Sequence, residues 1–216
     1  MVKAEQRAIK QLLIPSKVLM LNAGKSVAEF ILDNYSKSKK IGIAVGYGNN
    51  GGDGFVSALY LNKYEKDVKI VSLGNKLTFS PDANLYLSKC QEENINITFP
   101  SGKEIQQNTY FKDCDLIVDA LLGTGFQGEM RKPIASLIKS IPHDVPIVSV
   151  DIPSGLNGTT GKADKNCIVA NQTITFARPK IGMKNNEKYT GKLIVTEIGI
   201  PPICFDDNEW NKLTNN

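Results

Sequence analysis

Histidine and tryptophan are almost absent from this sequence, which has one of each, His143 and Trp210, among its 216 residues. The cysteines at positions 90, 114, 167 and 204 are far apart and form no Cys-x-x-Cys pair. A zinc site is therefore not expected, because structural zinc is held by clustered cysteine and histidine ligands. Isolated free thiols are instead typical of a reducing compartment.

Long apolar runs and a strong charge bias are also missing. No stretch is long enough to span a bilayer and no targeting signal is evident, so we expect a cytoplasmic protein without a membrane partner. The net charge of +4 comes from 26 basic and 22 acidic residues, which does not indicate nucleic-acid binding. No linker divides the chain, so we expect one domain over 1–216, with N-terminal helices at 1–35, a core at 36–200 and a tail at 201–216 that either frays or is anchored by Trp210.

Short apolar runs alternate with helix-like segments along most of the chain. Helices are predicted at 3–14, 16–35, 52–66, 81–93 and 131–141, with Ser16 as the N-cap of the second. Strands are predicted at 41–46, 68–73, 95–99, 115–120, 146–151, 172–177 and 193–198. This alternation predicts an α/β fold with a mostly parallel central sheet. The last two strands have no helix-length segment between them, so we expect them to pair antiparallel at an edge.

A glycine-dense segment, Gly46-Tyr-Gly-Asn-Asn-Gly-Gly-Asp-Gly54, separates the first predicted strand from a helix. Such a turn exposes backbone N–H groups at the positive end of a helix dipole, which favours a phosphate-bearing ligand. Gly46, Gly48 and Gly51 match the G-x-G-x-x-G fingerprint of dinucleotide-binding proteins. The acid expected after the next strand is missing from 72–76, which argues against an ordinary NAD dehydrogenase. Lys76 in that segment either faces a 2′-phosphate or is simply solvated.

Two aspartates, Asp119 and Asp151, end later strands and are each followed by a glycine-containing loop. Either one could cap a turn. Because the carboxyl ends of parallel strands share one edge of the sheet, we expect both to face the turn at 46–54. Pro153 restricts the backbone that follows Asp151. Asn50, Asp119 and Ser154 offer only oxygen ligands, which suit a hard cation.

Six motifs together resemble the YjeF N-terminal family, the NAD(P)H-hydrate epimerases. They are Leu19-Met20-x-Asn22-Ala23-Gly24, Gly48-Asn49-Asn50-Gly51-Gly52-Asp53-Gly54, Val118-Asp119-Ala120-Leu121-x-Gly123-x-Gly125-Phe126, Val150-Asp151-Ile152-Pro153-Ser154-Gly155, Thr175-Phe176-x-x-Pro179-Lys180 and Ile198-Gly199-Ile200-Pro201. The sequence departs from the family pattern at Leu21, where many members have Glu, and at Tyr47, where Pro or Lys is common. Tyr47 either stacks on the ligand or covers the turn.

The resemblance implies a Rossmann-like three-layer αβα sandwich, often dimeric, that acts on NADHX or NADPHX. These are the R and S hydrates of the nicotinamide cofactors, and an S-specific dehydratase restores the cofactor from the S form. At the positions that match the family motifs, the resemblance implies that Asn50, Asp119 and Ser154 hold a potassium ion. The expected substrate-binding residues are Asn49, Asn50, Gly51, Gly52, Asp53, Gly123, Thr124, Gly125, Phe126, Gln127, Gly128, Glu129 and Asp151.

The interpretation that follows is an isomerase in which Asp151 exchanges the proton needed for epimerisation. Two alternatives stay open at this point. One is a non-catalytic module of the same fold that dimerises and binds a nucleotide or RNA. The other is a different nucleotide or sugar-phosphate enzyme on a Rossmann-like frame.

Overall fold

A single sheet organises the molecule. The computed structural model describes residues 2–101, 104–106 and 110–206, and its seven-stranded sheet has the order β3-β2-β1-β4-β5-β6-β7. The strands are β1 (Lys40–Val45), β2 (Asp67–Ser72), β3 (Asn96–Thr98), β4 (Leu116–Ala120), β5 (Ile147–Val150), β6 (Gln172–Phe176) and β7 (Lys192–Thr196). Strand order reverses between β1 and β4, and in such sheets ligands bind beyond the carboxyl ends at this point.

The edge formed by β6 and β7 corrects the prediction of an antiparallel pair. The two strands are parallel, in register from Gln172 opposite Lys192 to Phe176 opposite Thr196. Their connection lacks a long helix. It instead contains two short helical segments, η2 (Ile181–Met183) and α6 (Glu187–Thr190), and brings the chain back to the edge of the sheet where β6 begins. Every strand pair of the sheet is therefore parallel.

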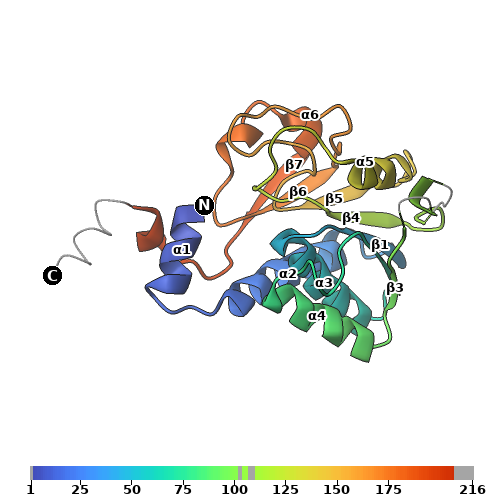
Figure 1. Ribbon diagram of the computed structural model, residues 1–216, viewed down its shortest axis with the longest axis horizontal. Helices are drawn as coiled ribbons and strands as arrows, with labels where there is room; N and C mark the ends of the chain where they lie inside the picture. The colour runs from blue at the N-terminus through green and yellow to red at the C-terminus, as the bar shows by residue number, and fades with distance from the viewer. Residues whose placement is uncertain (1, 102–103, 107–109, 207–216) are drawn as a thin grey trace.

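Helices cover both faces of the sheet, which confirms the predicted three-layer α/β class. Figure 1 shows α2, α3 and α4 together on one side and α5 on the other. The helices are α1 (Val2–Lys10), α2 (Ser16–Asn34), α3 (Asn49–Lys63), α4 (Pro81–Glu92) and α5 (Lys132–Lys139), with short 3-10 turns η1 (Glu104–Gln106) and η3 (Pro202–Phe205).

Two helix starts differ from the prediction. Ser16 is not the N-cap of α2, because Pro15 takes that position and the Ser16 hydroxyl donates to Asp82 on α4. Helix α3 begins at Asn49 rather than at 52, so most of the glycine-dense segment is the first turn of a helix and not a loop. Gly51 and Gly52 allow this helix to pack closely, since a β-carbon would lie 2.7 Å from the Gly46 carbonyl oxygen or 2.5 Å from Met20.

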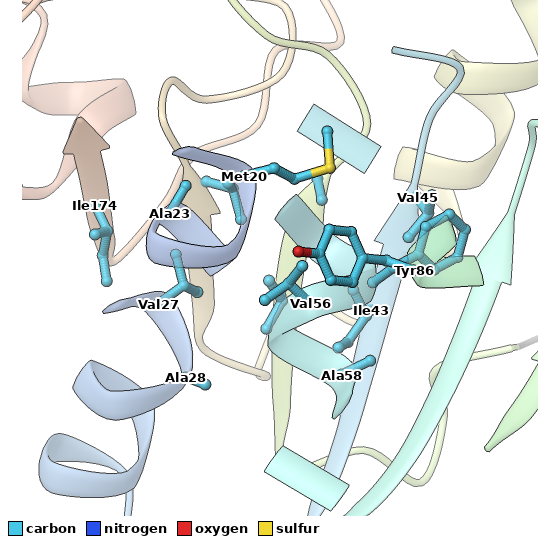
Figure 2. Close-up of a cluster of buried hydrophobic side chains, with 14 of the residues drawn as sticks. Met20, Ala23, Val27, Ala28, Ile43, Val45, Val56, Ala58, Tyr86 and Ile174 are labelled. Carbon is cyan, nitrogen blue, oxygen red and sulfur yellow. The ribbon is translucent and has the colours of Figure 1, made fainter. Parts of the chain in front are cut away.

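The core consists of apolar side chains that leave the central strands alternately on the two faces. On β1, Ile43 and Val45 pack beneath α2 and α3, whereas Ala44 packs on the face covered by α5. Met20 and Val56 are among the side chains that meet in the larger cluster (Figure 2). Burial on both faces explains why these strands are continuously apolar in the sequence.

The N-terminal helix docks on the end of the described chain. The Arg7 guanidinium donates to the carbonyl oxygen of Cys204 at 2.9 Å, which fixes α1 against η3. Trp210 and the rest of the predicted tail beyond Asp206 lie outside the described residues. Within the part of the chain that the structure describes, no helix combines the length and apolarity needed to cross a bilayer.

The substitution Gly46→Ala should destabilise the fold by about 3 kcal/mol, because a β-carbon there would lie 1.7 Å from the carbonyl oxygen of Leu121 and force β1 and β4 apart. Gly48→Ala is the matched control, since no atom lies within 4 Å of its β-carbon position and only about 0.5 kcal/mol should be lost. Urea unfolding of both variants measures the difference. Equal losses of stability would contradict this account of the close approach.

Candidate active site

A cavity of about 410 Å³ opens where the strand order reverses. Its lining comes from segments that are distant in the sequence: the start of α3, the loop after β4, the residue after β5, and the first half of α2. The predicted meeting of the three glycine-containing loops at one edge of the sheet is therefore observed. Tyr47 also lines the cavity.

The start of α3 gives the cavity an electropositive rim. Gly48 is the N-cap, Asn49 is the first helical residue, and the first turn carries no acidic side chain. The exposed amides at this end attract an anion. Of the residues predicted here, Asn49, Asn50 and Asp53 line the cavity, whereas the buried Gly51 and Gly52 do not.

A buried carboxylate ties the three loops together. Asp119 is fully buried and accepts hydrogen bonds from the Ser149 hydroxyl at 2.8 Å, the Ser154 amide at 2.9 Å and the Ser154 hydroxyl at 2.5 Å. The Ser154 hydroxyl also accepts from the Leu122 amide at 2.8 Å, and the Asn50 side chain donates to the Leu122 carbonyl at 3.0 Å. Burial raises the pKa of Asp119, opposed by these hydrogen bonds. The sequence-predicted trio of Asn50, Asp119 and Ser154 is thus one connected network.

Asp151 lines the cavity and is paired with a lysine. Its backbone is left-handed, with φ of 65°, and its carboxylate accepts from the Lys180 ammonium and the Phe176 amide, the latter at 3.2 Å. Lys180 is itself buried and donates to the Thr175 hydroxyl at 2.8 Å. The side chain of Asp151 is therefore oriented by its own backbone conformation and by the end of β6, in addition to the rigidity of Pro153.

Three further carboxyl groups line the same cavity, those of Asp53 on α3, Glu5 on α1 and Asp82 on α4. Burial raises the pKa of Asp53 well above its usual range, and the charges of Asp151 and Glu5 raise it further against the opposing effect of Lys180. Burial and the charge of Asp151 likewise raise the pKa of Glu5. Asp53 is consequently a carboxylic acid that holds its proton at higher pH than an ordinary aspartate.

The loop predicted to bind substrate, 123–129, is divided between two places. Gly123, Thr124, Gly125 and Phe126 line the first cavity. Phe126 also lines a second cavity, together with Gly128 and Glu129. Gln127 is exposed and lines neither cavity.

Sequence reasoning did not identify Lys180 or Glu5 as site residues. Lys180 stands in the motif Thr175-Phe176-x-x-Pro179-Lys180, so its presence there was a usable signal, although its partner Asp151 lies 29 positions earlier. Glu5 gives no such signal, because only the docking of α1 on η3 brings it to the cavity.

Replacing Asp53 by Asn should stabilise the protein at pH 7. The raised pKa means that the folded state binds a proton more tightly than the unfolded state, so wild-type stability falls as pH rises above about 4, the ordinary aspartate value. The advantage of Asp53→Asn should thus grow from pH 4 to pH 8, as measured by denaturant unfolding.

The control is Asp115→Asn, where the opposite sign is expected. The Asp115 carboxylate accepts from the Lys39 and Lys40 amides, and these hydrogen bonds lower its pKa. Its contribution to stability is present at neutral pH and is lost as pH falls, so this variant should be less stable than the wild type at pH 7. A loss of stability in Asp53→Asn that does not depend on pH would refute the assignment of a raised pKa to this carboxyl group.

Known proteins resemble this chain in sequence and in fold. A family model described as YjeF-related protein N-terminus matches residues 16–182. An NAD(P)H-hydrate epimerase of Nitrosopumilus maritimus (strain SCM1) is 36% identical over 189 residues, which cover 86% of this chain and 86% of the relative. The bifunctional NAD(P)H-hydrate repair enzyme Nnr of Pyrobaculum aerophilum is 33% identical over 198 residues, which cover 88% of this chain but only 38% of that enzyme.

A solved structure supports the fold. The crystal structure of yeast ynu0 superposes with a TM-score of 0.73 and 21% identity, covering 91% of this chain and 84% of that one. The chain spans well under half the length of the bifunctional relatives it matches. The family model, by contrast, covers most of this chain, which confirms the resemblance found in its motifs. This chain therefore belongs to the family of YjeF-related protein N-terminal domains.

Proposed function

We propose that this protein is an NAD(P)H-hydrate epimerase, which interconverts the R and S forms of NADHX and NADPHX. The observation that carries the proposal is the pairing, in one cavity, of a lysine-bound carboxylate at Asp151 with a half-buried acid of raised pKa at Asp53. Relatives of similar length carry the epimerase name, among them the Nitrosopumilus maritimus protein. Exchange of the hydroxyl group at C6 needs a proton donor for the departing oxygen and a proton acceptor for the incoming water, and this cavity holds carboxyl groups for both.

The chemistry follows from the hydrated ring. The lone pair of the ring nitrogen expels hydroxide from C6 and leaves a planar iminium. Water then adds to the opposite face, which inverts the configuration. Departure of hydroxide requires a proton from the protein, and addition of water requires a group that takes a proton up.

The two carboxyl groups divide these tasks. Lys180 and the Phe176 amide hold Asp151 as an acceptor, so we assign it the proton taken from the incoming water. Burial and the nearby negative charges raise the pKa of Asp53, so we assign to it the proton given to the departing hydroxyl. For the reverse direction the roles exchange. This refines the interpretation from the sequence, which gave both tasks to Asp151.

The remaining walls suit a dinucleotide. Leu19, Met20, Leu121, Phe176 and Ile198 form an apolar lining that limits water around the planar intermediate. The amides at the start of α3 and the loop at 123–125 lie at the same cavity, where a pyrophosphate is favoured by the helix dipole.

The test is the substitution Asp151→Asn, assayed by consumption of R-NADHX or R-NADPHX in the presence of an S-specific dehydratase. The kcat should fall by roughly a hundredfold or more, the scale of general acid–base catalysis, while the circular dichroism spectrum stays unchanged. Asp33→Asn, on the exposed surface of α2, is the matched control and should retain full activity. Full epimerisation by Asp151→Asn would remove this carboxylate from the mechanism, and inactivity of the wild type would refute the proposed function.

A potassium ion fits the network around Asp119. This carboxylate is buried, and the hydrogen-bond donors around it are neutral hydroxyls and amides, so a monovalent cation would offset its charge. Asn50, Asp119 and Ser154 would hold the ion through oxygen atoms, the ligand type that hard cations prefer. When bound, the ion supplies positive charge that orders the three loops.

Potassium should therefore stabilise the folded protein. At a concentration one hundred times its Kd, a ligand of the folded state adds about 2.7 kcal/mol, so melting in KCl should occur at a higher temperature than in choline chloride of equal concentration. The difference should disappear in Asn50→Ala, which removes one oxygen ligand. Identical melting of the wild type in the two salts would contradict the potassium site.

The S product of epimerisation is the substrate of the dehydratase, so we propose that the enzyme works together with an S-specific dehydratase. Bifunctional repair enzymes among the relatives support this coupling. The homodimer and the cytoplasmic location stay predictions from the sequence.

A further inference from the structure

A second cavity, of about 890 Å³, lies beside the first. Phe126 lines both, and its carbonyl oxygen accepts a hydrogen bond of 3.1 Å from the Asn157 side chain on the far wall. Gly128 and Glu129 also line this second cavity. The loop predicted to bind substrate is therefore a partition between two cavities, and a ligand that contacts the whole loop must enter both.

The two cavities differ in charge. All charged residues that line the first are acidic, namely Glu5, Asp53, Asp82 and Asp151. The second is lined by four lysines, Lys132, Lys139, Lys162 and Lys165, against two acids, Glu129 and Asp164. A phosphate is therefore disfavoured beside the carboxyl groups of the first cavity, away from the start of α3, and is attracted into the second cavity.

The Asp164 carboxylate is negatively charged and offsets part of the lysine charge, so the lysines exceed the acids by two, and its oxygens are bound to the cavity wall. It accepts from the Met130 amide at 3.0 Å, from the Asn166 amide at 2.8 Å and from the Asn166 side chain at 3.1 Å. Its pKa is lowered by these hydrogen bonds and by Lys165, although burial opposes them. The wall is thereby fixed between the loop at 130 and the segment at 157–166.

The lysines come from two separate walls of the second cavity. Lys132 and Lys139 lie on one face of α5 with Ser136, at spacings of four and three residues. Lys162 and Lys165 stand on the opposing loop, which Asn157 shapes by accepting from the amides of 159 and 160. All four side chains are exposed and so reach a ligand without moving packed structure.

We propose that the second cavity binds the adenosine end of the dinucleotide and that its lysines recognise the ribose 2′-phosphate of NADPHX. This inference rests on the proposed function. The hydrated ring then lies among the carboxyl groups of the first cavity, and the pyrophosphate crosses near the start of α3 and Phe126. Lys76, the residue considered from the sequence for the 2′-phosphate, is exposed and lines neither cavity.

Calorimetry with two nucleotides tests the site. Adenosine 2′,5′-bisphosphate should bind the wild type about tenfold more tightly than adenosine 5′-monophosphate, the ratio expected when one charge-assisted contact is gained. The double variant Lys132→Gln/Lys162→Gln, with one change on each wall, should lose this preference. Lys63→Gln/Lys89→Gln makes the same change of net charge on the exposed ends of α3 and α4 and should keep it. Equal affinity of the wild type for both nucleotides, or an unchanged preference in the cavity variant, would overturn the proposal.

Kinetics separate this inference from the proposed function. The cavity variant should show a KM for NADPHX raised about tenfold, an unchanged kcat and a nearly unchanged KM for NADHX. Calorimetry does not depend on turnover. Lysine-dependent binding without epimerisation would support the second site and refute only the proposed function, whereas normal epimerisation with equal nucleotide affinities would refute only the second site.

Discussion

The buried carboxylate of Asp119 is the constraint on which the rest of the site depends. It accepts hydrogen bonds from the hydroxyl and the amide of Ser154 and from the hydroxyl of Ser149. The Ser154 hydroxyl oxygen in turn accepts a hydrogen bond from the Leu122 amide. Asn50 completes the connection to α3 through the Leu122 carbonyl. A buried charge is tolerated only when its hydrogen bonds are complete, so the loops after β1, β4 and β5 are held in one arrangement. Asp53 is three positions after Asn50 and Asp151 is three positions before Ser154, so the network also fixes the backbone that positions these two aspartates.

Strain and pairing then set the chemistry of Asp151. A left-handed backbone at a non-glycine residue costs free energy and persists only where the surroundings enforce it. Here the chain continues into Ser154, which is bound to Asp119, while the Asp151 amide donates to the Ile174 carbonyl at 2.8 Å. The buried Lys180 keeps the carboxylate oriented as an acceptor. The carboxyl group of Asp53 has no lysine bound to it. Burial and the negative charges of Asp151 and Glu5 therefore raise its pKa. Two aspartates in one cavity thus have different surroundings, which is the basis for the different roles that we propose for them.

Much of the site at the carboxyl edge of the sheet was predictable from the sequence, because it depends on local sequence patterns. Apolar runs that end in Asp119 and Asp151 predict strands and carboxylates at one edge of a parallel sheet. The start of α3 was misplaced because Asn and Gly usually signal turns, and only packing against Met20 and Gly46 shows why glycines are accepted within this helix. The parallel pairing of β6 and β7 depends on the path of an irregular connection, which has no periodicity to read. Lys180 and Glu5 reach the site by tertiary packing, so their roles were not derivable from spacing.

The acidity of the first cavity is also the physical reason for the second binding region that we propose. Raising the pKa of Asp53 requires negative charge and burial close by, and the same field disfavours phosphates. A dinucleotide substrate must therefore place its uncharged ring and its phosphates in different electrostatic surroundings. The loop at 123–129 achieves this separation, since Gly123 faces the network of Asn50 while Glu129 lies beside the lysines of α5 and of 157–166. The positive start of α3 lines the first cavity together with the loop at 123–125, where we place the bridging pyrophosphate of such a substrate. In the proposed enzyme, acid–base chemistry at one end and anion recognition at the other are consequently linked by the division of charge across a single loop.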